Sequence, residues 1–354
     1  MKNKSILMIG TSLETKGGIS AVVDSYKNAG LFDDFGVIYI VTHSDGSIIK
    51  KLYLGLKSYA AYFYYLWRQK IQIVHIHVSF RMSFWRKLPF ILLSKLLGKK
   101  IIFHLHSSGF REFYEEELTS WQQKIALKAI SMSNKILVLN QESQNWLLKI
   151  IPDADVLILN NGITPKNYDF ANRNSLQMLF LGQINREKGF WDLLNALGEL
   201  KKNGFEFQLI AGGDGDLDTA KELTHKYGLD QNVTFVGWIR GKAKQRVLET
   251  SSILVLPSYY EAMPMSILEG MSASMPIVAS NVGGIPRQVE NGVEGFLIEP
   301  GNIEELKDKF ELLLTSNSLR LKMSQAAKSK FDKEFSTSVI LPKLKNIYEE
   351  TLIK

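Results

Sequence analysis

The 354-residue sequence contains no cysteine, and this absence limits both its structure and its chemistry. A chain without cysteine has no disulfide framework and no thiolate metal ligands, and it suits a reducing compartment such as the cytoplasm. It also lacks any apolar run of about 18 residues, the length that a spanning helix needs. Lys4 leads directly into an apolar segment at residues 6–9. We therefore expect neither a membrane-spanning helix nor a signal peptide.

Acidic residues are missing from one long segment. Residues 46–111 contain 12 Lys and Arg side chains and no Asp or Glu, although the whole chain carries a net charge of only +7. A surface of one charge sign implies an anionic partner. Trp67, Trp85 and a tyrosine-rich stretch at 59–65 are interleaved with these cations. Rings and basic tips together suit a lipid headgroup layer, so we expect an anionic membrane surface as the partner.

Nucleotide-binding and metal-binding motifs of the common kinds are also absent. Gly241 and Lys242 are followed by Ala243, so there is no Walker loop. Asp214, Asp216 and Asp218 have the spacing that begins an EF-hand loop, but Thr219 replaces the required glycine. His75 and His77 alternate on a predicted strand with no third ligand nearby in sequence, which favours a near-core pair over a metal site. We expect no metal and no cofactor.

Strand and helix patterns alternate along nearly the whole chain. A polar segment at residues 165–175 interrupts the alternation, and the length leaves room for an ordinary domain on each side. The pattern predicts two α/β domains with parallel sheets, at 1–164 and 176–335, followed by a last helix at 336–354.

The segment 253–301 combines an anion site with carboxylates. An apolar strand at 253–256 ends at Pro257, and Glu261 precedes a helix that begins near Pro264. Glu269 lies eight residues after Glu261. Free amides and the positive dipole end of the helix attract phosphate, whereas carboxylates accept hydrogen bonds from sugar hydroxyls. The segment therefore predicts a binding site for a nucleotide sugar.

This segment resembles the donor site of retaining family 4 (group 1) glycosyltransferases. The resemblance rests on the spacing of Glu261 and Glu269, the turn Gly283-Gly284-Ile285-Pro286, and the later Asn291, Gly292 and Gly295. It implies an α/β protein of GT-B fold, with two facing Rossmann-like domains and a deep cleft between them. It also implies hexose transfer from a UDP- or GDP-sugar with retention of configuration, and a last helix that packs back on the first domain.

The resemblance also assigns roles to individual residues. Lys188 matches the family's lysine for the donor diphosphate, while Gln183 stands where an arginine is usual and Arg186 follows three residues later. Glu269 would bind the ribose, Glu261 and His106 the transferred sugar. The remaining donor contacts would come from Gly17, Gly18, Met263, Pro264, Met265 and Ser266. We take His106, Lys188 and Glu261 as the catalytic candidates.

The acceptor is predicted from residues 83–87 and 104–109, which resemble the branch that elongates lipid-linked oligosaccharides for exopolysaccharide or capsule. We expect the acceptor pyrophosphate near Arg81, Arg86 and Lys87, on a protein peripheral to the inner face of a bacterial cell membrane. Two alternatives stay open, a GT-B nucleotide-sugar epimerase and a non-catalytic sugar-nucleotide-binding subunit. A nucleic-acid partner is not expected, because the cations lie within Rossmann-like elements.

Overall fold

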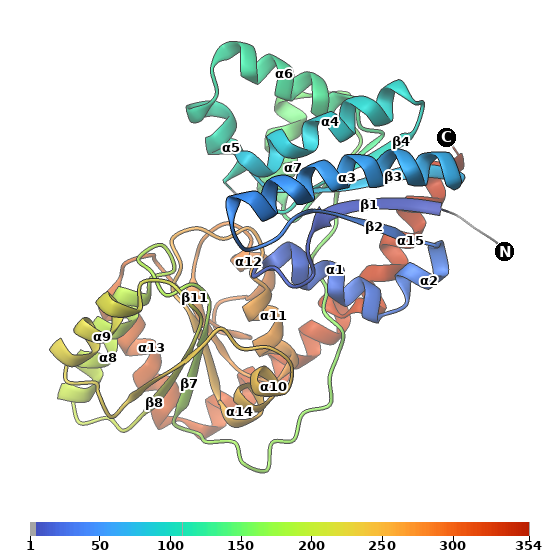
Figure 1. The fold of residues 1–354 in the computed structure, drawn as a ribbon. Helices are drawn as coiled ribbons and strands as arrows, with labels where there is room; N and C mark the ends of the chain where they lie inside the picture. The colour runs from blue at the N-terminus through green and yellow to red at the C-terminus, as the bar shows by residue number, and fades with distance from the viewer. Residues whose placement is uncertain (1–4, 108, 354) are drawn as a thin grey trace. The chain divides into compact units, whose positions relative to one another are not determined.

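The computed structural model describes residues 5–107 and 109–353, and it divides into two compact units (Figure 1). The first unit comprises residues 1–164 and 336–354, and the second is the continuous segment 165–335. Each unit is built on one sheet of six parallel strands. In the described part of the chain, no helix has the length and apolar character needed to cross a bilayer.

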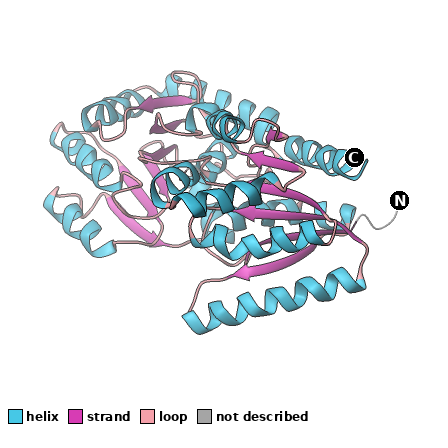
Figure 2. Ribbon diagram, turned by 90° about the horizontal axis from the view of Figure 1, so that it is seen from above, coloured by secondary structure: helices cyan, strands magenta, loops and turns pink. Residues whose placement is uncertain are grey.

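The first sheet has the strand order β2-β1-β3-β4-β5-β6. Helices flank this sheet, with α1, α2 and α15 on one side and α3 and α4 on the other (Figure 1). Figure 2 shows the same alternation of strands and helices from above. Its strands are β1 (Ser5–Thr11), β2 (Ile38–His43), β3 (Ile71–Val78), β4 (Lys100–Leu105), β5 (Lys135–Val138) and β6 (Val156–Ile158). Its helices are α1 (Gly18–Asn28), α2 (Leu31–Phe35), α3 (Ile48–Arg68), α4 (Met82–Leu96), α5 (Phe110–Glu112), α6 (Ser120–Ser131), α7 (Gln141–Ile150) and α15 (Thr337–Ile353).

The apolar core of this unit explains why β3 and β4 form a continuous buried pair. Val74 and Ile76 of β3 pack with Phe103 of β4 and with Phe84 and Phe90 of α4, and all five are fully buried. Near-continuous apolar runs of this kind are typical of strands covered on both faces. The opposite face of the same strands carries histidines instead, as described below.

The second sheet has the strand order β12-β11-β10-β7-β8-β9. Its strands are β7 (Gln177–Leu181), β8 (Gln208–Gly212), β9 (Val233–Gly237), β10 (Ile253–Leu256), β11 (Ile277–Ser280) and β12 (Gly295–Ile298). Its helices are α8 (Phe190–Lys202), α9 (Leu217–Lys226), α10 (Gly241–Thr250), α11 (Met265–Ser272), α12 (Ile285–Gln288), α13 (Ile303–Thr315) and α14 (Asn317–Lys330). The Asp216 side chain caps α9 by accepting from the Thr219 amide at 3.1 Å, so this acidic loop has a structural use.

Two segments differ from the sequence-based expectation. Residues 110–117, for which we predicted no element, form α5 and a π-helical turn at Phe113–Glu117. The polar segment 165–175 has little regular structure but is anchored to the second unit. Arg173 donates to the carbonyls of Ala273 at 2.6 Å and Ser274 at 3.0 Å, at the end of α11. Burial lowers the pKa of Arg173 to about 10, still far above neutrality.

The last helix, α15, belongs to the first unit, where it packs on β3 and α1. Tyr348 of α15 is fully buried, and its hydroxyl lies 2.7 Å from Nδ1 of His75. Lys135 is bonded to Glu350 at 3.0 Å. These contacts fix the helix on one face of the first sheet.

Candidate functional site

The second sheet has a topological switch point between β7 and β10. From β7 the chain proceeds to β8 and β9 on one side, whereas β10, β11 and β12 lie on the other side. The loops that follow β7 and β10 therefore diverge at the carboxyl edge of the sheet and leave a crevice, the position where open parallel sheets bind ligands. Lys188 lies on the loop after β7, and Glu261 lies on the loop after β10.

The loop after β7 is held in place by close backbone contacts. Gly189 has a φ of +67°, and a Cβ at this position would lie 1.9 Å from the Pro257 carbonyl oxygen. Only glycine adopts this conformation so close to another backbone. The Tyr259 amide donates to the Glu187 carbonyl at 2.9 Å, and the Lys188 amide donates to Asn185 Oδ1 at 2.9 Å. The backbone of Lys188 is therefore fixed against the loop after β10.

The carboxylate of Glu261 is positioned from both ends. Its Oε1 accepts from Lys188 Nζ at 2.6 Å and from Ser258 Oγ at 3.0 Å. On the backbone side, the Gly284 amide donates to the Glu261 carbonyl at 3.2 Å. Gly283 has a φ of +52°, and a Cβ there would lie 1.8 Å from the same carbonyl oxygen. Gly283 is thus required for the position of Glu261, whereas Gly284 contributes a backbone amide.

Glu269 and the start of α11 complete this edge. Glu269 Oε1 accepts from Lys244 Nζ at 2.8 Å, and both side chains are partly exposed. Pro264 precedes the first turn of α11, where no side chain caps the amides and no acidic residue lies. Such a turn can bind an anion through its amides and dipole. The donor set therefore contains two cation–carboxylate pairs beside an uncapped helix N-terminus.

The other predicted donor residues are distributed around these pairs. Gln183 and Arg186 are exposed on the loop after β7, whereas Met263 and Pro264 are buried. Met265 and Ser266 are partly exposed in the first turn of α11. Sequence reasoning missed Lys244, because it lies on α10, outside the segment that carries the motif. A lysine at an exposed helix position has no signal of its own in the sequence.

The first sheet has its own switch point, between β1 and β3, and a pocket of about 510 Å³ lies there. Thr11, Lys16, Arg81 and Arg86 are among its lining residues. The helix α1 begins beside this loop at Gly18, and both Gly17 and Gly18 are exposed. Arg81 and Arg86, two of the three predicted acceptor residues, thus line one pocket. Lys16, which the sequence analysis did not single out, lines the same pocket.

Arg81 has an acidic neighbour that we did not predict. Its guanidinium forms a bidentate ion pair with Glu117, with Nε and Nη2 at 2.8 and 2.6 Å from the carboxylate oxygens. Its φ is +52°, an unfavourable conformation for a residue with a side chain, and such residues concentrate at functional sites. Glu117 comes from the π-helical turn missed in the sequence analysis.

Lys87 is a correction, because we expected its side chain at the surface near the acceptor. The side chain is fully buried, and its Nζ donates to Ser83 Oγ at 2.9 Å. Burial and the nearby Arg86 lower the pKa of Lys87 to about 7. As the structure stands, Lys87 does not line the pocket that contains Arg81 and Arg86.

His106 belongs to a group of four stacked imidazoles from β3 and the β4 edge. His77 Nδ1 lies 2.7 Å from His106 Nε2, and His75 Nε2 lies 3.2 Å from His104 Nδ1. The two hydrogen-bonded pairs stack on each other, with His75 and His77 rings 4.4 Å apart. Burial, the main cause, lowers the pKa of all four and brings those of His75 and His106 to about 3, so the rings stay neutral near pH 7.

His104 lies beside His75 and His77 and supplies the third imidazole that the sequence analysis found missing, so the group must be considered as a possible metal site. Nitrogen atoms of His75, His77 and His104 lie within 4.8 Å of one another. However, the short contacts join ring nitrogens to one another, and no carboxylate belongs to the group. Among the described residues, Nε2 of His77 and Nε2 of His104 are buried without a hydrogen-bond partner. The arrangement fits neutral hydrogen-bonded pairs better than a metal centre, whose ligands would converge on one point.

Comparison with known proteins defines the class. The family model described as glycosyl transferases group 1 matches residues 167–330. An alpha-D-kanosaminyltransferase of Streptomyces kanamyceticus is 31% identical over 73% of this chain and 72% of its own. A UDP-Gal:alpha-D-GlcNAc-diphosphoundecaprenol alpha-1,3-galactosyltransferase of Escherichia coli is 24% identical over 84% of this chain and 80% of its own.

The fold comparison agrees with this class. A sucrose-phosphate synthase from Thermosynechococcus elongatus superposes with a TM-score of 0.81 at 17% identity, over 98% of both chains. The two Rossmann-like halves are those of a GT-B glycosyltransferase, as expected from the sequence. The chain belongs to the group 1 glycosyltransferase family, and it is a glycosyltransferase.

Proposed function

We propose that this enzyme transfers a hexose, with retention of configuration, from a UDP- or GDP-sugar to a lipid-linked glycan acceptor. The observation that carries the donor half is the pairing of Lys188 with Glu261 and of Lys244 with Glu269 beside the uncapped start of α11. Cations and free amides suit a diphosphate, and carboxylates suit ribose and sugar hydroxyls. The E. coli relative, whose printed name includes a UDP-sugar and a diphosphoundecaprenol acceptor, supports the same substrate classes.

The chemistry breaks the bond between the anomeric carbon and the donor phosphate oxygen and forms a bond to an acceptor hydroxyl. The proton of that hydroxyl leaves with the nucleotide diphosphate. Negative charge grows on the departing phosphate, so fixed positive groups stabilise the transition state more than the ground state. Lys188 and the α11 amides would supply this stabilisation without a metal, and Arg186 is the further cation on the same loop. His106 and the Gly17–Gly18 turn are proposed as substrate contacts of the first unit.

In the structure, Lys188 is paired with Glu261 and Lys244 with Glu269. When the donor binds, these four side chains must form hydrogen bonds to it in place of some of the bonds between them. Glu261 retains Ser258 as a hydrogen-bond donor when Lys188 turns to the diphosphate, so its charge stays solvated. We propose that Glu261 then accepts from sugar hydroxyls and that Glu269 accepts from the ribose. Replacement of Glu269 by alanine should weaken nucleotide binding by roughly 1–3 kcal/mol, the scale of a hydrogen bond to a charged group.

Calorimetry with UDP and GDP tests this assignment. Glu222→Ala is the matched control, because Glu222 is an exposed glutamate of α9. The control should bind nucleotide as the wild type does. Unchanged nucleotide affinity in a folded Glu269→Ala protein would contradict the proposed donor site.

The acceptor half is proposed from the acid-free segment 46–111 and from the pocket that contains Lys16, Arg81 and Arg86. A pyrophosphate carried on a lipid would bind there, and the enzyme would work at the inner face of the bacterial membrane in cell-surface glycan synthesis, such as exopolysaccharide or capsule. Incubation with labelled UDP- and GDP-hexoses and a bacterial membrane extract tests it. Label in the lipid fraction is expected. Donor conversion without acceptor would instead identify an epimerase, and binding without turnover would identify a binding subunit.

A further inference from the structure

The helix α3 presents its apolar stripe to solvent, the reverse of the usual arrangement. Ile49, Leu56 and Trp67 are 79%, 73% and 81% exposed. A surface helix of a globular protein normally turns such a stripe toward the core. Spacings of four and three residues along 49, 53, 56, 60, 63 and 67 place these positions on a single stripe of the helix. Leu52, Tyr53, Phe63 and Tyr64 are also at least half exposed.

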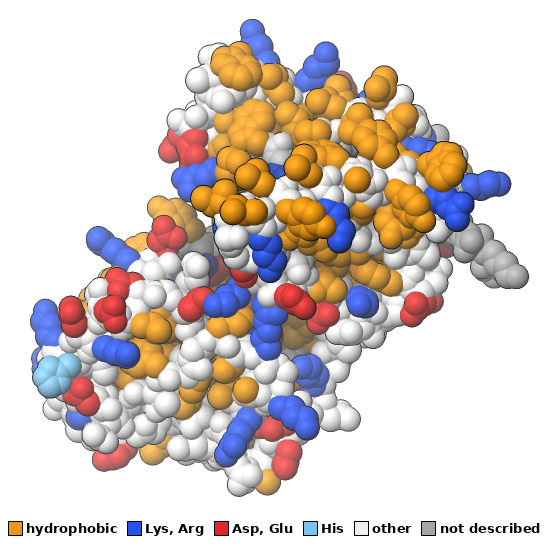
Figure 3. Space-filling view, in the orientation of Figure 1, with side chains coloured by type: hydrophobic (Ala, Val, Ile, Leu, Met, Phe, Trp, Pro, Cys, Tyr) orange, Lys and Arg blue, Asp and Glu red, His pale blue; other side chains and the backbone are white. Residues whose placement is uncertain are grey.

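The orientation of α3 is fixed by its other face. Tyr62 is fully buried, and its hydroxyl lies 2.7 Å from Ser94 Oγ of α4. The Tyr59 ring stacks on Phe90 of α4 at 4.6 Å between centroids. Because these contacts anchor the inner face, the outer stripe cannot turn inward without breaking them. In Figure 3, hydrophobic side chains cover much of the face over α3, with Lys and Arg side chains around them.

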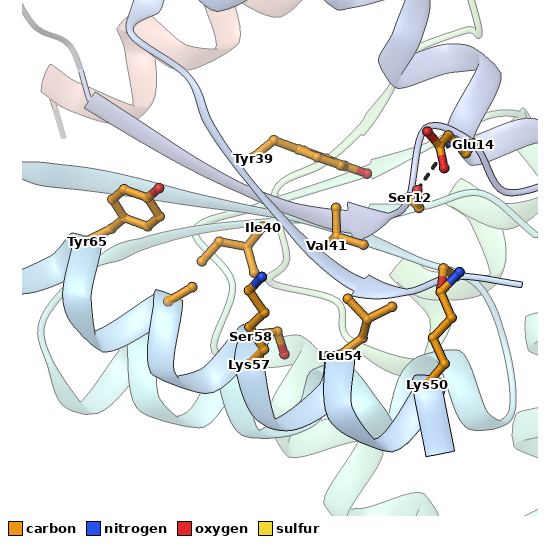
Figure 4. A pocket seen from close by; sticks show the side chains of 12 residues that line it. Ser12, Glu14, Tyr39, Ile40, Val41, Lys50, Leu54, Lys57, Ser58 and Tyr65 are labelled. Carbon is orange, nitrogen blue, oxygen red and sulfur yellow. Dashed lines mark hydrogen bonds between the residues drawn. The ribbon is translucent and has the colours of Figure 1, made fainter. Parts of the chain in front are cut away.

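Cations line one flank of this stripe. Lys50, Lys57 and Arg68 are exposed, and their spacing of seven and eleven residues places them along one side of the helix. Lys50 and Lys57 also line a cavity of about 400 Å³ between α3 and β2, and Figure 4 shows both side chains reaching from the helix toward that strand. Glu14 lines the same cavity and offsets part of this charge, but residues 46–111, which include the whole of α3, contain no acidic residue.

The charge pattern selects the occupant of this surface. A second copy of the same face would place the basic flanks of two helices near each other, and Glu14 in each copy would offset only part of their charge. An anionic bilayer offers both complements, acyl chains for the stripe and phosphate headgroups for the flank. Exposed Trp and Tyr rings suit the same boundary, since their rings bury while their polar tips stay hydrated.

We propose that α3 lies in the plane of an anionic bilayer surface, with the stripe Ile49, Leu56, Phe63 and Trp67 below the headgroups and Lys50, Lys57 and Arg68 among them. This inference deepens the proposed function, on which it rests for the lipid-linked acceptor, by naming the element that holds the enzyme to its substrate's membrane. Composition alone predicts electrostatic binding to the membrane, whereas this arrangement adds insertion of apolar side chains. Apolar insertion is insensitive to salt, whereas the cationic flank is screened, so part of the binding should survive high salt.

Vesicle co-sedimentation with matched variants tests the proposal. The wild type should bind vesicles of phosphatidylglycerol mixed with phosphatidylcholine and should retain part of this binding at high salt. The double variant Leu56→Gln/Trp67→Gln should bind at least roughly thirtyfold more weakly, from the apolar area that two such side chains bury. Both residues are exposed, so the fold should be unaffected. The control is Leu321→Gln, a leucine of α14 that is 55% exposed, and it should bind as the wild type does.

The charge variant separates the two contributions. Lys50→Gln/Lys57→Gln/Arg68→Gln should lower binding at low salt by roughly tenfold to a hundredfold and remove most of its salt dependence. Equal binding of the wild type and the Leu56→Gln/Trp67→Gln variant would overturn the proposal. So would a dimer in gel filtration that dissociates in this variant, because the face would then belong to a second copy.

A transfer assay keeps this proposal distinct from the proposed function. In detergent, where the acceptor no longer lies in a bilayer, the Leu56→Gln/Trp67→Gln enzyme should transfer sugar at the wild-type rate. Transfer without any binding to anionic vesicles would refute the role of α3 and leave the function standing. Vesicle binding through α3 without transfer to any lipid-linked acceptor would refute the proposed function and leave the surface standing.

Discussion

Acidification should destabilise the first unit through its stacked histidines. Burial lowers the pKa of His75, His77, His104 and His106, so the folded unit holds them neutral. In the unfolded chain the same side chains titrate near their ordinary pKa of about 6.5. Below that pH the unfolded state binds more protons, so the free energy of unfolding falls as pH falls. The loss continues toward pH 3, where the pKa values of His75 and His106 lie in the folded protein.

The magnitude follows from the number of histidines. Each neutral buried imidazole contributes about 1.4 kcal/mol per pH unit below its unfolded pKa. Between about pH 7.5 and 5.5, four of them should lower the free energy of unfolding by roughly 5 kcal/mol, a large fraction of the stability of an ordinary domain. Free carboxylates titrate below this window. Lys87 and His43, whose pKa values are also lowered in the folded protein, add a smaller loss of the same sign, so the four stacked histidines dominate the slope.

Urea unfolding at a series of pH values measures this dependence. Hydrogen exchange of the β3 and β4 amides assigns the loss to the first unit. His104→Leu should reduce the loss between about pH 7.5 and 5.5 by about 1.4 kcal/mol, because one titrating group is removed. His225→Gln is the control outside the first unit, since the His225 side chain is 85% exposed on α9, and it should leave the exchange of the β3 and β4 amides unchanged. A free energy of unfolding that is constant over this range would refute the reasoning.

Three further predictions concern the second unit. Lys188→Ala should lower turnover more than donor affinity, and the loss of transition-state stabilisation should be roughly 2–4 kcal/mol. Steady-state kinetics measure both values. The control is Lys221→Ala, at an exposed lysine of α9, and it should change neither turnover nor donor affinity. Gly283→Ala should cost at least roughly 1 kcal/mol of stability and also lower activity, because the added Cβ would displace the Glu261 carbonyl; normal activity in this variant would contradict the position assigned to Glu261. Arg173→Met should lower the thermal midpoint of the second unit, because it removes a partly buried cation from the carbonyls at the end of α11; calorimetry checks the shift.

The fold was predictable because its signals are local and repeated. Short apolar strands alternating with amphipathic helices predict parallel sheets, and the polar segment 165–175 marks the boundary between the halves. The sequence motif also located Glu261 and Glu269 on one sheet edge, because strand, loop and helix follow one another directly there. What it could not supply was their partners. Lys188 and Lys244 reach these carboxylates from other loops and helices, and such pairs form only when the strands are ordered in space.

Burial of polar residues was the least predictable property. Lys87 and Arg86 are neighbours in sequence, yet Lys87 is fully buried while Arg86 lines a pocket. His104 could not be linked to His75 and His77 before β3 and β4 were paired in register. The aromatic residues of α3 divide in the same way, with Tyr62 inside and Trp67 outside. Composition gives the number of aromatic and charged residues. Whether each one is buried or exposed depends on the face of the helix or strand on which it lies.

The discontinuity of the first unit has a consequence for the order of synthesis. Its sheet is encoded by residues 1–164, but Tyr348, the partner of His75, is 273 residues further along the chain. The second unit is continuous and ends at residue 335, so all of its residues are synthesised before α15, the last helix of the first unit. During that interval one face of β3 and the His75 ring are without their cover. A released chain truncated after residue 336 would therefore contain the complete second unit and an unfinished first unit, the reverse of their order in the gene.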